Sequence, residues 1–498
     1  MGGYLLGIDA GNTVTKAVLF DRAGRQVSQA ARRCAVSSPH LRWAERDMEA
    51  AWETTADAIA ACLRGAGIRA KEVAAVGLAG HSDGLYPVGY PAGGALRPAR
   101  PAVLATDSRA HAIVEHWRAC GVLGQVLPLT GTEPFAASPA ALCAWFARHE
   151  PEMLGRTRWL LFAKDWLRLR LTGEVATDPT DAAASFCDIR TRAYSPGALA
   201  LFGLAGIEEK LPPVVPGDAV AGTVTAGAAA RTGLAEGTPV TCGVHDVDAA
   251  ATAMGAAQPG MLSMVAGTFS INQVISTQVR TSPRWQARPF VTPGRWLNMS
   301  TSPSSASNLE WFVGRFGPAG ADPYAMASAE AEAVLSEPAA VVYLPFLYGS
   351  PQGAAPSGTF AGMRGHHSRG HLIRALFEGV VCAHRSHVEA LRDGFAISPA
   401  ARLSGGAARS AVWSQMFADA LRLDIEVPDC AETGALGAAL IAGTGIGAWR
   451  DLDEAAAAAV RIARRHQPHQ AAASRFDAIY QTYQDLSRAL GPVWDKLG

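Results

Sequence analysis

The sequence has little charge and no excess of either sign. Charged residues make up 18% of its 498 residues, and 44 Lys and Arg balance 44 Asp and Glu, so the formal net charge is zero. Because the chain also lacks a basic run, nucleic acid and anionic membrane surfaces are not expected partners. Its 49% of hydrophobic residues argues against a disordered chain, and its length predicts more than one compact core.

Long apolar runs and paired cysteines are missing as well. The glycine-rich stretch GALGAALIAGTGIGAW (434–449) is too short to span a bilayer. The opening MGGYLLGIDAGN carries no basic stretch and reaches an aspartate at position 9, which does not fit a secretory signal. The eight cysteines are scattered without a CxxC spacing, as expected of reduced thiols. These features predict a cytoplasmic protein without a membrane partner.

Strand and helix patterns alternate along the chain. Apolar runs at 4–9 and 16–21 flank the turn Gly11-Asn12, helical periodicity covers 48–64, and a further strand is expected at 73–79. A similar plan restarts with a strand over 238–246, a helix after it, and a strand–turn–strand pattern over 261–276. The alternation predicts an α/β fold, with two related halves that meet near residues 235–245.

Phosphate-binding motifs of the common kinds are absent, since the sequence has neither GxxxxGK[ST] nor GxGxxG opening a helix. Three glycine-centred turns could instead cradle phosphates with backbone N–H groups: Gly11–Thr13, Gly267-Thr268 and Gly405-Gly406. Asp9, at the end of the first strand, could hold Mg²⁺ directly or through water. Each turn could equally be an ordinary connection, and Asp9 an Asx-turn cap.

Three further places combine polar side chains with predicted strand ends. Asp246 ends the strand over 238–246 and could serve as a base in phosphoryl transfer, or else as a helix N-cap. The loops containing His81-Ser82-Asp83 and Asp107-Ser108-Arg109 suit a polyhydroxylated ligand, although either could be a simple turn.

Several longer stretches resemble one known family. GTFAGMRGHHSRGHLIRALFE (358–378) is similar to the C-terminal pattern of the FGGY family of carbohydrate kinases, and residues 162–188 to its N-terminal pattern. GIDAGNTVTKAVLFD resembles the family's first phosphate motif, and LSGGAARSAVWSQMFADALRLDIEV with ETGALGAAL its adenosine motif. The resemblance runs from about residue 4 to residue 445.

This resemblance implies two actin-like (ribonuclease-H-like) ATPase domains that flank a deep cleft, within the α/β class. Residues 1–240 would form the sugar-binding domain and residues 241–498 the ATP-binding domain, with ATP and Mg²⁺ as cofactors and a homodimer as an oligomeric state common in the family. Asp246 corresponds to the catalytic base, with Asp248 as the fallback, and Asp9 to the acid near Mg²⁺. The other cofactor-binding positions implied are Asn12, Thr13, Lys16, Gly267, Thr268, Gly405, Gly406 and Ala407. Those implied for the sugar are His81, Ser82, Asp83, Asp107, Arg109 and Asp246.

The sugar loops differ from those of D-xylulose kinases. That group carries Gln-Met-His-Gly where this chain has His81-Ser82-Asp83-Gly84, whereas WAERDM (43–48) and LPFLYGS (344–350) are more similar to bacterial L-xylulose kinases. The resemblance therefore implies ATP-dependent phosphorylation of a terminal hydroxyl of a ketopentose of the xylulose type. The alternatives are an erythritol or polyol kinase, a non-sugar actin-like ATPase module, and a transferase acting on a carboxylate, which the acids of the loops disfavour.

Overall fold

The computed structural model describes residues 3–90, 94–318, 320–338, 340–350, 356–494 and 496. The chain forms two compact units, each assembled from separate segments. Unit 1 contains residues 1–258, 276–297 and 432–460, and unit 2 contains residues 259–275, 298–431 and 461–498. The domain limits expected at residues 240 and 241 remain a prediction. No helix among the described residues is long and apolar enough to cross a membrane.

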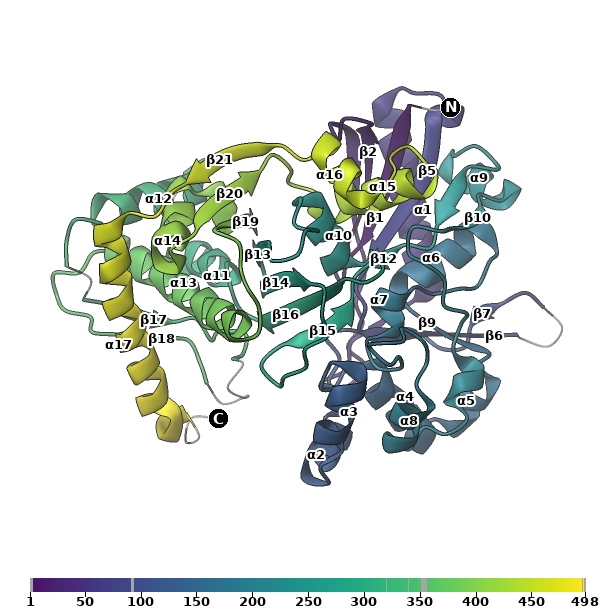
Figure 1. Ribbon diagram of the computed structural model, residues 1–498, viewed down its shortest axis with the longest axis horizontal. Coiled ribbons are helices and arrows are strands. Elements are labelled where there is room, and N and C mark those ends of the chain that lie inside the picture. Colours follow the sequence, from purple (N-terminus) through teal and green to yellow (C-terminus); the bar gives the residue numbers. More distant parts are fainter. Residues whose placement is uncertain are drawn as a thin grey trace. The chain divides into compact units, whose positions relative to one another are not determined.

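Unit 1 is organised around a seven-stranded mixed sheet with the strand order β10-β11-β5-β1-β2-β3, in which β12 also pairs with β5. Strand β1 lies antiparallel to β2 and parallel to β5 (Figure 1). The strands of this sheet are β1 (Tyr4–Ala10), β2 (Val14–Asp21), β3 (Gln26–Arg33), β5 (Val73–Gly80), β10 (Val220–Thr223), β11 (Pro239–Thr241) and β12 (Val244–His245). The helices connected with it are α1 (Met48–Ala66), η1 (Ala70–Glu72), α6 (Ala163–Thr172), α7 (Pro179–Ala182), α9 (Ala226–Thr232), α10 (Asp246–Ala253), α15 (Thr433–Gly445) and α16 (Leu452–Ala459). The predicted strands at 4–9, 16–21 and 73–79 and the helix at 48–64 are confirmed.

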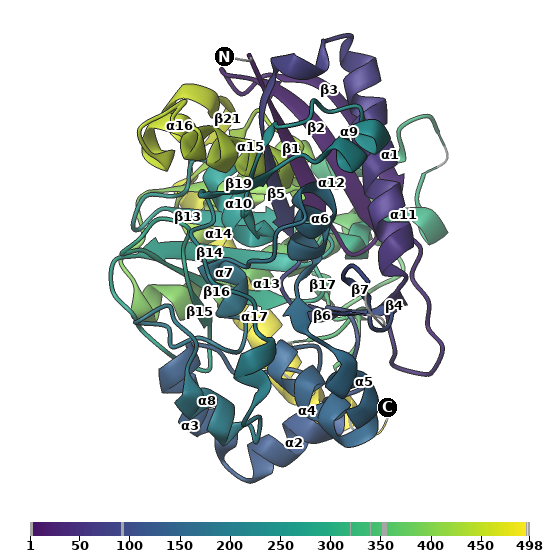
Figure 2. The same ribbon diagram turned by 90° about the vertical axis from the view of Figure 1, so that its right-hand side faces the viewer.

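Helices cover the two faces of this sheet in different ways. Leu6 and Ile8 of β1 belong to one buried cluster with Trp52 of α1, and Figure 2 shows α1 running along β2 and β3. Because side chains alternate along a strand, Gly7 points to the opposite face. There α15 packs so closely that a Cβ on Gly7 would lie 1.8 Å from the Ala435 carbonyl oxygen. The small residues of α15 therefore allow it to lie directly on the backbone of β1.

The prediction of a single strand over 238–246 is wrong, because a break separates β11 from β12. Gly243 has a φ of 86°, and a Cβ at this position would lie 2.5 Å from the Leu78 carbonyl oxygen. Only glycine adopts this conformation at so close an approach without strain. Beyond the break, β12 pairs with β5 through His245 and Gly80, and Asp246 is the first residue of α10. The acid thus still follows directly from a strand end.

Unit 1 also contains a smaller five-stranded sheet with the order β4-β8-β6-β7, in which β9 pairs with β6. Leu85 and Val103 of this sheet share a buried cluster with side chains of the surrounding helices, including Phe146. The loop 81–83 connects β5 of the large sheet to β6 of the small one. The strands of the small sheet are β4 (Glu45–Arg46), β6 (Gly84–Gly89), β7 (Arg97–Pro98), β8 (Ala102–Leu104) and β9 (Trp159–Leu161). The other elements of unit 1 are α2 (His111–Ala119), α3 (Val122–Thr130), α4 (Pro139–His149), α5 (Pro151–Arg156), α8 (Pro196–Leu201), η2 (Ile207–Lys210) and β15 (Gln286–Pro289).

Unit 2 repeats the central plan of unit 1. Its strands follow the order β16-β14-β13-β19-β20-β21, and β13 lies antiparallel to β14 and parallel to β19, as β1 does to β2 and β5. The predicted strand–turn–strand over 261–276 is confirmed. Unit 2 comprises β13 (Leu262–Ala266), β14 (Ser270–Ser276), β16 (Trp296–Ser302), α11 (Ser307–Phe316), α12 (Pro323–Ala333), β17 (Val342–Leu344), β18 (Thr359–Ala361), α13 (Arg369–Gly394), β19 (Ala400–Gly405), η3 (Ala407–Arg409), α14 (Ala411–Leu421), β20 (Asp424–Pro428), β21 (Ile462–His466) and α17 (Gln470–Trp494). Both units are α/β, as the sequence predicts.

Candidate functional site

Three parallel strands of unit 1 bring predicted site residues to one edge of the large sheet. Ala10 of β1 and His245 of β12 are both in register with Gly80 of β5. The turn 11–13, the loop 81–83 and Asp246 therefore all start from the carboxyl ends of neighbouring strands. In α/β sheets this edge is the usual place for a ligand.

Asp9 lies near the end of β1, in register with Lys16 of β2. Burial raises the pKa of the Asp9 carboxyl group to about 7, and repulsion from Asp246 adds to this rise, while Lys16 opposes it. The Lys16 ammonium group is itself 2.7 Å from a Glu432 carboxylate oxygen. Glu432 directly precedes α15, so this ion pair joins residues 416 positions apart in the sequence.

The turn after β1 is held in place by its own backbone and by Arg46. The Gly11 N–H donates to the Val14 carbonyl oxygen at 3.1 Å, and Arg46 donates to the carbonyl oxygens of Gly11 and Asn12. The Asn12 Oδ1 atom is buried and has no hydrogen-bond partner among the described residues. Thr13 is exposed. The turn thus offers one unsatisfied oxygen close in sequence to the Asp9 carboxylate.

The segment 245–248 places two carboxylates on either side of one imidazole. His245 Nε2 is 3.1 Å from Asp246 Oδ1, and its Nδ1 is 3.8 Å from Asp248 Oδ2. The Asp246 side chain is 36% exposed, whereas that of Asp248 is fully buried, and neither oxygen of Asp248 has a hydrogen-bond partner among the described residues. The N-cap of α10 is His245 rather than Asp246, and its side chain makes no capping hydrogen bond.

These different environments separate the two acids electrostatically. Burial tends to raise the pKa of Asp246, but the charge and hydrogen bond of His245, with a smaller contribution from His81, lower it below its ordinary value. Burial raises the pKa of Asp248 to about 8, because His245 and Arg288 offset this effect only in part. At neutral pH Asp246 is therefore a carboxylate, and Asp248 is mostly protonated.

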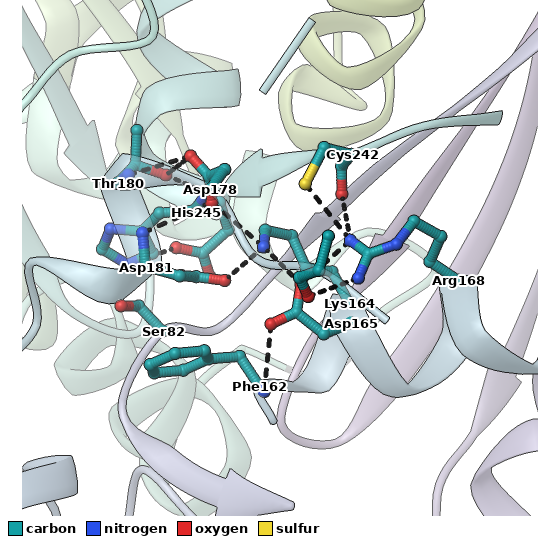
Figure 3. A network of polar contacts seen from close by, with 12 residues as sticks. Ser82, Phe162, Lys164, Asp165, Arg168, Asp178, Thr180, Asp181, Cys242 and His245 are labelled. Atoms are coloured by element: carbon teal, nitrogen blue, oxygen red, sulfur yellow. Dashed lines mark hydrogen bonds and ion pairs between the residues drawn. The ribbon is translucent and has the colours of Figure 1, made fainter. Parts of the chain in front are cut away.

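A buried ionic network contacts the backbone of the segment 245–248 (Figure 3). Lys164 Nζ lies 2.8 Å from Asp165, 3.0 Å from Asp178 and 2.8 Å from Asp181, and all four side chains are completely buried. The Thr180 hydroxyl donates to Asp178 at 2.6 Å and accepts the backbone N–H of His245 at 2.9 Å. The network, which comes from the stretch 162–188, thus connects directly to the backbone that carries Asp246.

The loop 81–83 contacts a residue that sequence reasoning missed. Arg288 of β15 donates to the Ser82 hydroxyl at 2.7 Å and lies 3.4 Å from Asp83 Oδ2. His81 is held between the Asp83 carbonyl oxygen and the Tyr86 hydroxyl. Burial, with Arg46 nearby, lowers the pKa of His81 to about 4, so its imidazole is neutral.

Asp107 and Arg109 pair with each other, while Arg109 Nη1 has no hydrogen-bond partner among the described residues. The Asp107 carboxylate accepts from the Arg109 backbone N–H, its Nε and its Nη2, and also from the Ala44 N–H at 2.7 Å. Arg109 Nη2 further contacts Glu45 at 2.8 Å, and the guanidinium lies 3.8 Å from the centre of the Trp43 ring. Both side chains are fully buried. Their visible role is to fix the segment after β8, and sequence alone gives no sign of this pairing.

In unit 2 the structure brings together the two glycine turns predicted to contact nucleotide. Ala266 of β13 is in register with Gly405 of the parallel β19, so Gly267-Thr268 and Gly405-Gly406 follow neighbouring strands. Gly405 has a φ of 89°, and a Cβ there would lie 2.6 Å from the Ala266 carbonyl oxygen. Thr268 and Gly406 are exposed and Ala407 is buried. Exposed backbone turns at the ends of parallel strands are suited to phosphate binding.

Comparisons with known proteins agree with this arrangement. Residues 4–253 match the N-terminal domain, and residues 262–446 the C-terminal domain, of the FGGY family of carbohydrate kinases. The chain is 34% identical over 493 residues to the probable L-xylulose kinase of Pasteurella multocida, covering 98% of this chain and 99% of the relative. It is 35% identical over 501 residues to the L-xylulose/3-keto-L-gulonate kinase of Escherichia coli K12, covering 98% of both. The crystal structure of the xylulose kinase from Rhodospirillum rubrum matches with a TM-score of 0.88 and 30% identity, covering 99% of this chain and all of that one.

Proposed function

Since the chain belongs to the FGGY family of carbohydrate kinases, we propose that it transfers the γ-phosphate of ATP to a terminal hydroxyl group of a ketopentose of the xylulose type. In this proposal Asp246 is the general base. The reaction class follows from the family. The ketopentose is supported by the names of the two relatives, a probable L-xylulose kinase and an L-xylulose/3-keto-L-gulonate kinase.

The observation that carries the base assignment is the contrast between Asp246 and Asp248. Asp246 is partly exposed at the edge where β1, β5 and β12 end, and its low pKa keeps it ionised at neutral pH. Asp248, the fallback from the sequence, is fully buried and its pKa is about 8. A base must reach the proton that it accepts. Only Asp246 of the pair meets this condition.

The residues expected to bind MgATP fit that group. The Asp9 carboxylate and the unsatisfied Asn12 Oδ1 supply oxygen donors, which Mg²⁺ prefers. When bound, the metal would neutralise charge on the transferring phosphate. In unit 2 the turns at Gly267-Thr268 and Gly405-Gly406 would contact the phosphates and the nucleoside, although the Gly267 N–H already donates to the Phe269 carbonyl oxygen. In unit 1 we assign Asp9, Asn12, Thr13 and Lys16 to the binding of Mg²⁺ and phosphate.

The acceptor sugar is assigned to the loop 81–83, beside Asp246. Its hydroxyl groups would meet Asp83, whose side chain is 14% exposed. His81 is neutral and both its ring nitrogens are already engaged, so it would act by fixing the shape of the loop. Asp107 and Arg109 contribute through the geometry of the segment after β8, since both side chains are already paired.

The test is an assay of ADP release with MgATP and a panel of acceptors: D- and L-xylulose, D- and L-ribulose, erythritol, xylitol, glycerol and gluconate. We expect a clear preference for one ketopentose. Replacing Asp246→Asn should reduce turnover by about 10²–10⁴-fold, the usual contribution of a general base. ATP binding, measured by calorimetry, should remain.

Three outcomes would contradict the proposal. Turnover of D246N at the wild-type rate would exclude Asp246 as the base. A preference for erythritol or another polyol would replace the ketopentose. ADP release that is equal with every acceptor and with none would favour an actin-like ATPase module.

A further inference from the structure

Arg288 is a deeply buried cation that comes from outside the sequence motifs. It lies in β15, within the segment 276–297 that returns to unit 1, and it is only 2% exposed. Its Nη1 donates to the Ser82 hydroxyl at 2.7 Å, and its Nη2 lies 3.4 Å from Asp83 Oδ2 and 3.3 Å from Gln286 Oε1. Contacts across 206 residues of sequence therefore hold the loop 81–83.

The charge of Arg288 also acts on the acids around it. It lowers the pKa of Asp248, which burial otherwise raises, and it opposes protonation of His245. The titratable groups that interact with Arg288 are Asp83, His245 and Asp248. Asp178, Asp181 and Asp246 act in turn on His245 or Asp248. A buried guanidinium requires a compensating anion. Among the contacts of Arg288 described above, Asp83 is the carboxylate that provides it.

Asp83 and Arg288 differ in what a ligand can reach. The Asp83 side chain is 14% exposed, whereas that of Arg288 is 2% exposed. The Asp83 Oδ1 atom is itself buried and has no hydrogen-bond donor among the described residues. The carboxylate can thus still accept a hydrogen bond, while its Oδ2 faces Arg288. The ion pair leaves this part of the site without net charge, which suits a neutral hydroxylated ligand better than an anion.

We propose that Arg288 is a positioning residue for the acceptor sugar. It orients Ser82 and Asp83 so that the Asp83 carboxylate accepts a hydroxyl group of the ketose, and the Asp83–Arg288 pair makes the site prefer neutral acceptors to sugar acids. This inference rests on the proposed function, because it requires an acceptor sugar at the loop 81–83. It adds Arg288 to that function as the residue that sets the preference for neutral acceptors over sugar acids.

The first experiment compares R288M and R288K with the wild type. In R288M the KM for the preferred ketopentose should rise about 10- to 100-fold, as expected when a charged hydrogen bond is lost. The KM for ATP should stay unchanged, and kcat should fall much less than the KM rises. R288K should lie between the two, because lysine keeps the charge but loses the planar fork. The exposed Arg280→Met, in the same segment, is the matched control.

The second experiment tests the pair. D83N should raise the same KM, and the double variant D83N/R288M should be affected less than the product of the two single effects, because both remove one interaction. D83N alone leaves the Arg288 guanidinium without its compensating carboxylate. The activity of this variant on gluconate, relative to its activity on the ketopentose, should therefore increase. The D83N and R288K arms remain informative even if R288M does not fold.

An unchanged ketopentose KM in R288M, or effects of D83N and R288M that multiply independently, would overturn the assignment of Arg288. These results differ from a failure of the proposed function. If the proposed function is wrong, the wild type will show no acceptor-dependent ADP release, or D246N will retain that release, and both proposals will then be refuted.

Discussion

The replacement of Lys164 by methionine tests how the structure stabilises the backbone that carries Asp246. The Lys164 ammonium group is completely buried, and three carboxylates surround it within 3.0 Å. Burial tends to lower its pKa, but Asp165, Asp181 and Asp178 together raise that pKa well above its ordinary value. The lysine is therefore charged in the folded protein. Methionine would remove its charge from all three carboxylates, of which Asp165 keeps Arg168 and Asp178 keeps the Thr180 hydroxyl, whereas Asp181 loses its ion pair.

The expected cost is about 3–5 kcal/mol, the usual range when one partner of a buried ion pair is removed. At roughly 2–4 °C per kcal/mol for a large domain, the unfolding transition should fall by about 6–20 °C. Differential scanning calorimetry measures this shift directly. The control is K71M, which removes an exposed lysine of the same unit and should leave the transition unchanged.

A second substitution distinguishes the electrostatic explanation from a loss of packing. Burial, together with Asp178 and Asp165, raises the pKa of Asp181 to about 7 even though Lys164 opposes this effect. Adding Asp181→Asn to K164M removes one unpaired acid, so part of the lost stability should return. A K164M transition that coincides with that of K71M would refute the reasoning. A double variant no more stable than K164M would show that charge is not the cause.

Three further predictions concern neighbouring features. The pKa of Asp248 is about 8 when folded and 3.8 ordinarily, so its contribution to stability is present below pH 4 and lost as the pH rises to about 8; D248N should flatten the fall in melting temperature over this range, and an unchanged slope would argue against a protonated Asp248. H245Q removes the group that lowers the pKa of Asp246, so the acidic limb of kcat/KM should move to higher pH, and an unmoved limb would contradict the role of His245. A Cβ on Gly77 would lie 1.9 Å from the Ala438 carbonyl oxygen, while one on Gly124 meets nothing within 4 Å; urea unfolding should show G77A destabilised by about 1–3 kcal/mol or more and G124A unchanged or more stable, and equal stability of the two would refute the close approach of α15.

Local sequence predicts the parts of this structure that depend on local interactions. The hairpins β1–β2 and β13–β14 follow from short apolar runs around glycine turns, and Asp9 and Asp246 are recognisable as acids at strand ends. The break in the strand before Asp246 was not predictable, because it depends on how closely Gly243 approaches Leu78, more than 160 positions earlier.

The residues that sequence reasoning missed share one property, which is that their partners are distant in the chain. Glu432 pairs with Lys16 and Arg288 with Ser82, and neither pairing leaves a periodic or compositional signal. The opposite difficulty applies to Asp107 and Arg109. Their polarity suggests a ligand loop, but whether such groups are free or already paired depends on Trp43 and Glu45, which only the tertiary structure places beside them.

The alternation of segments between the two units has a consequence for synthesis on the ribosome. The chain passes from one unit to the other five times, and unit 1 is complete only after residue 460. Until α15 has emerged, one face of β1 and β5 exposes its glycines without the helix that covers them. A nascent chain of 300 residues thus holds most of unit 1 in an unfinished form. Production of this protein should therefore depend on how quickly the last third of the chain is translated, and a premature stop before residue 432 should yield a fragment prone to degradation rather than a working half.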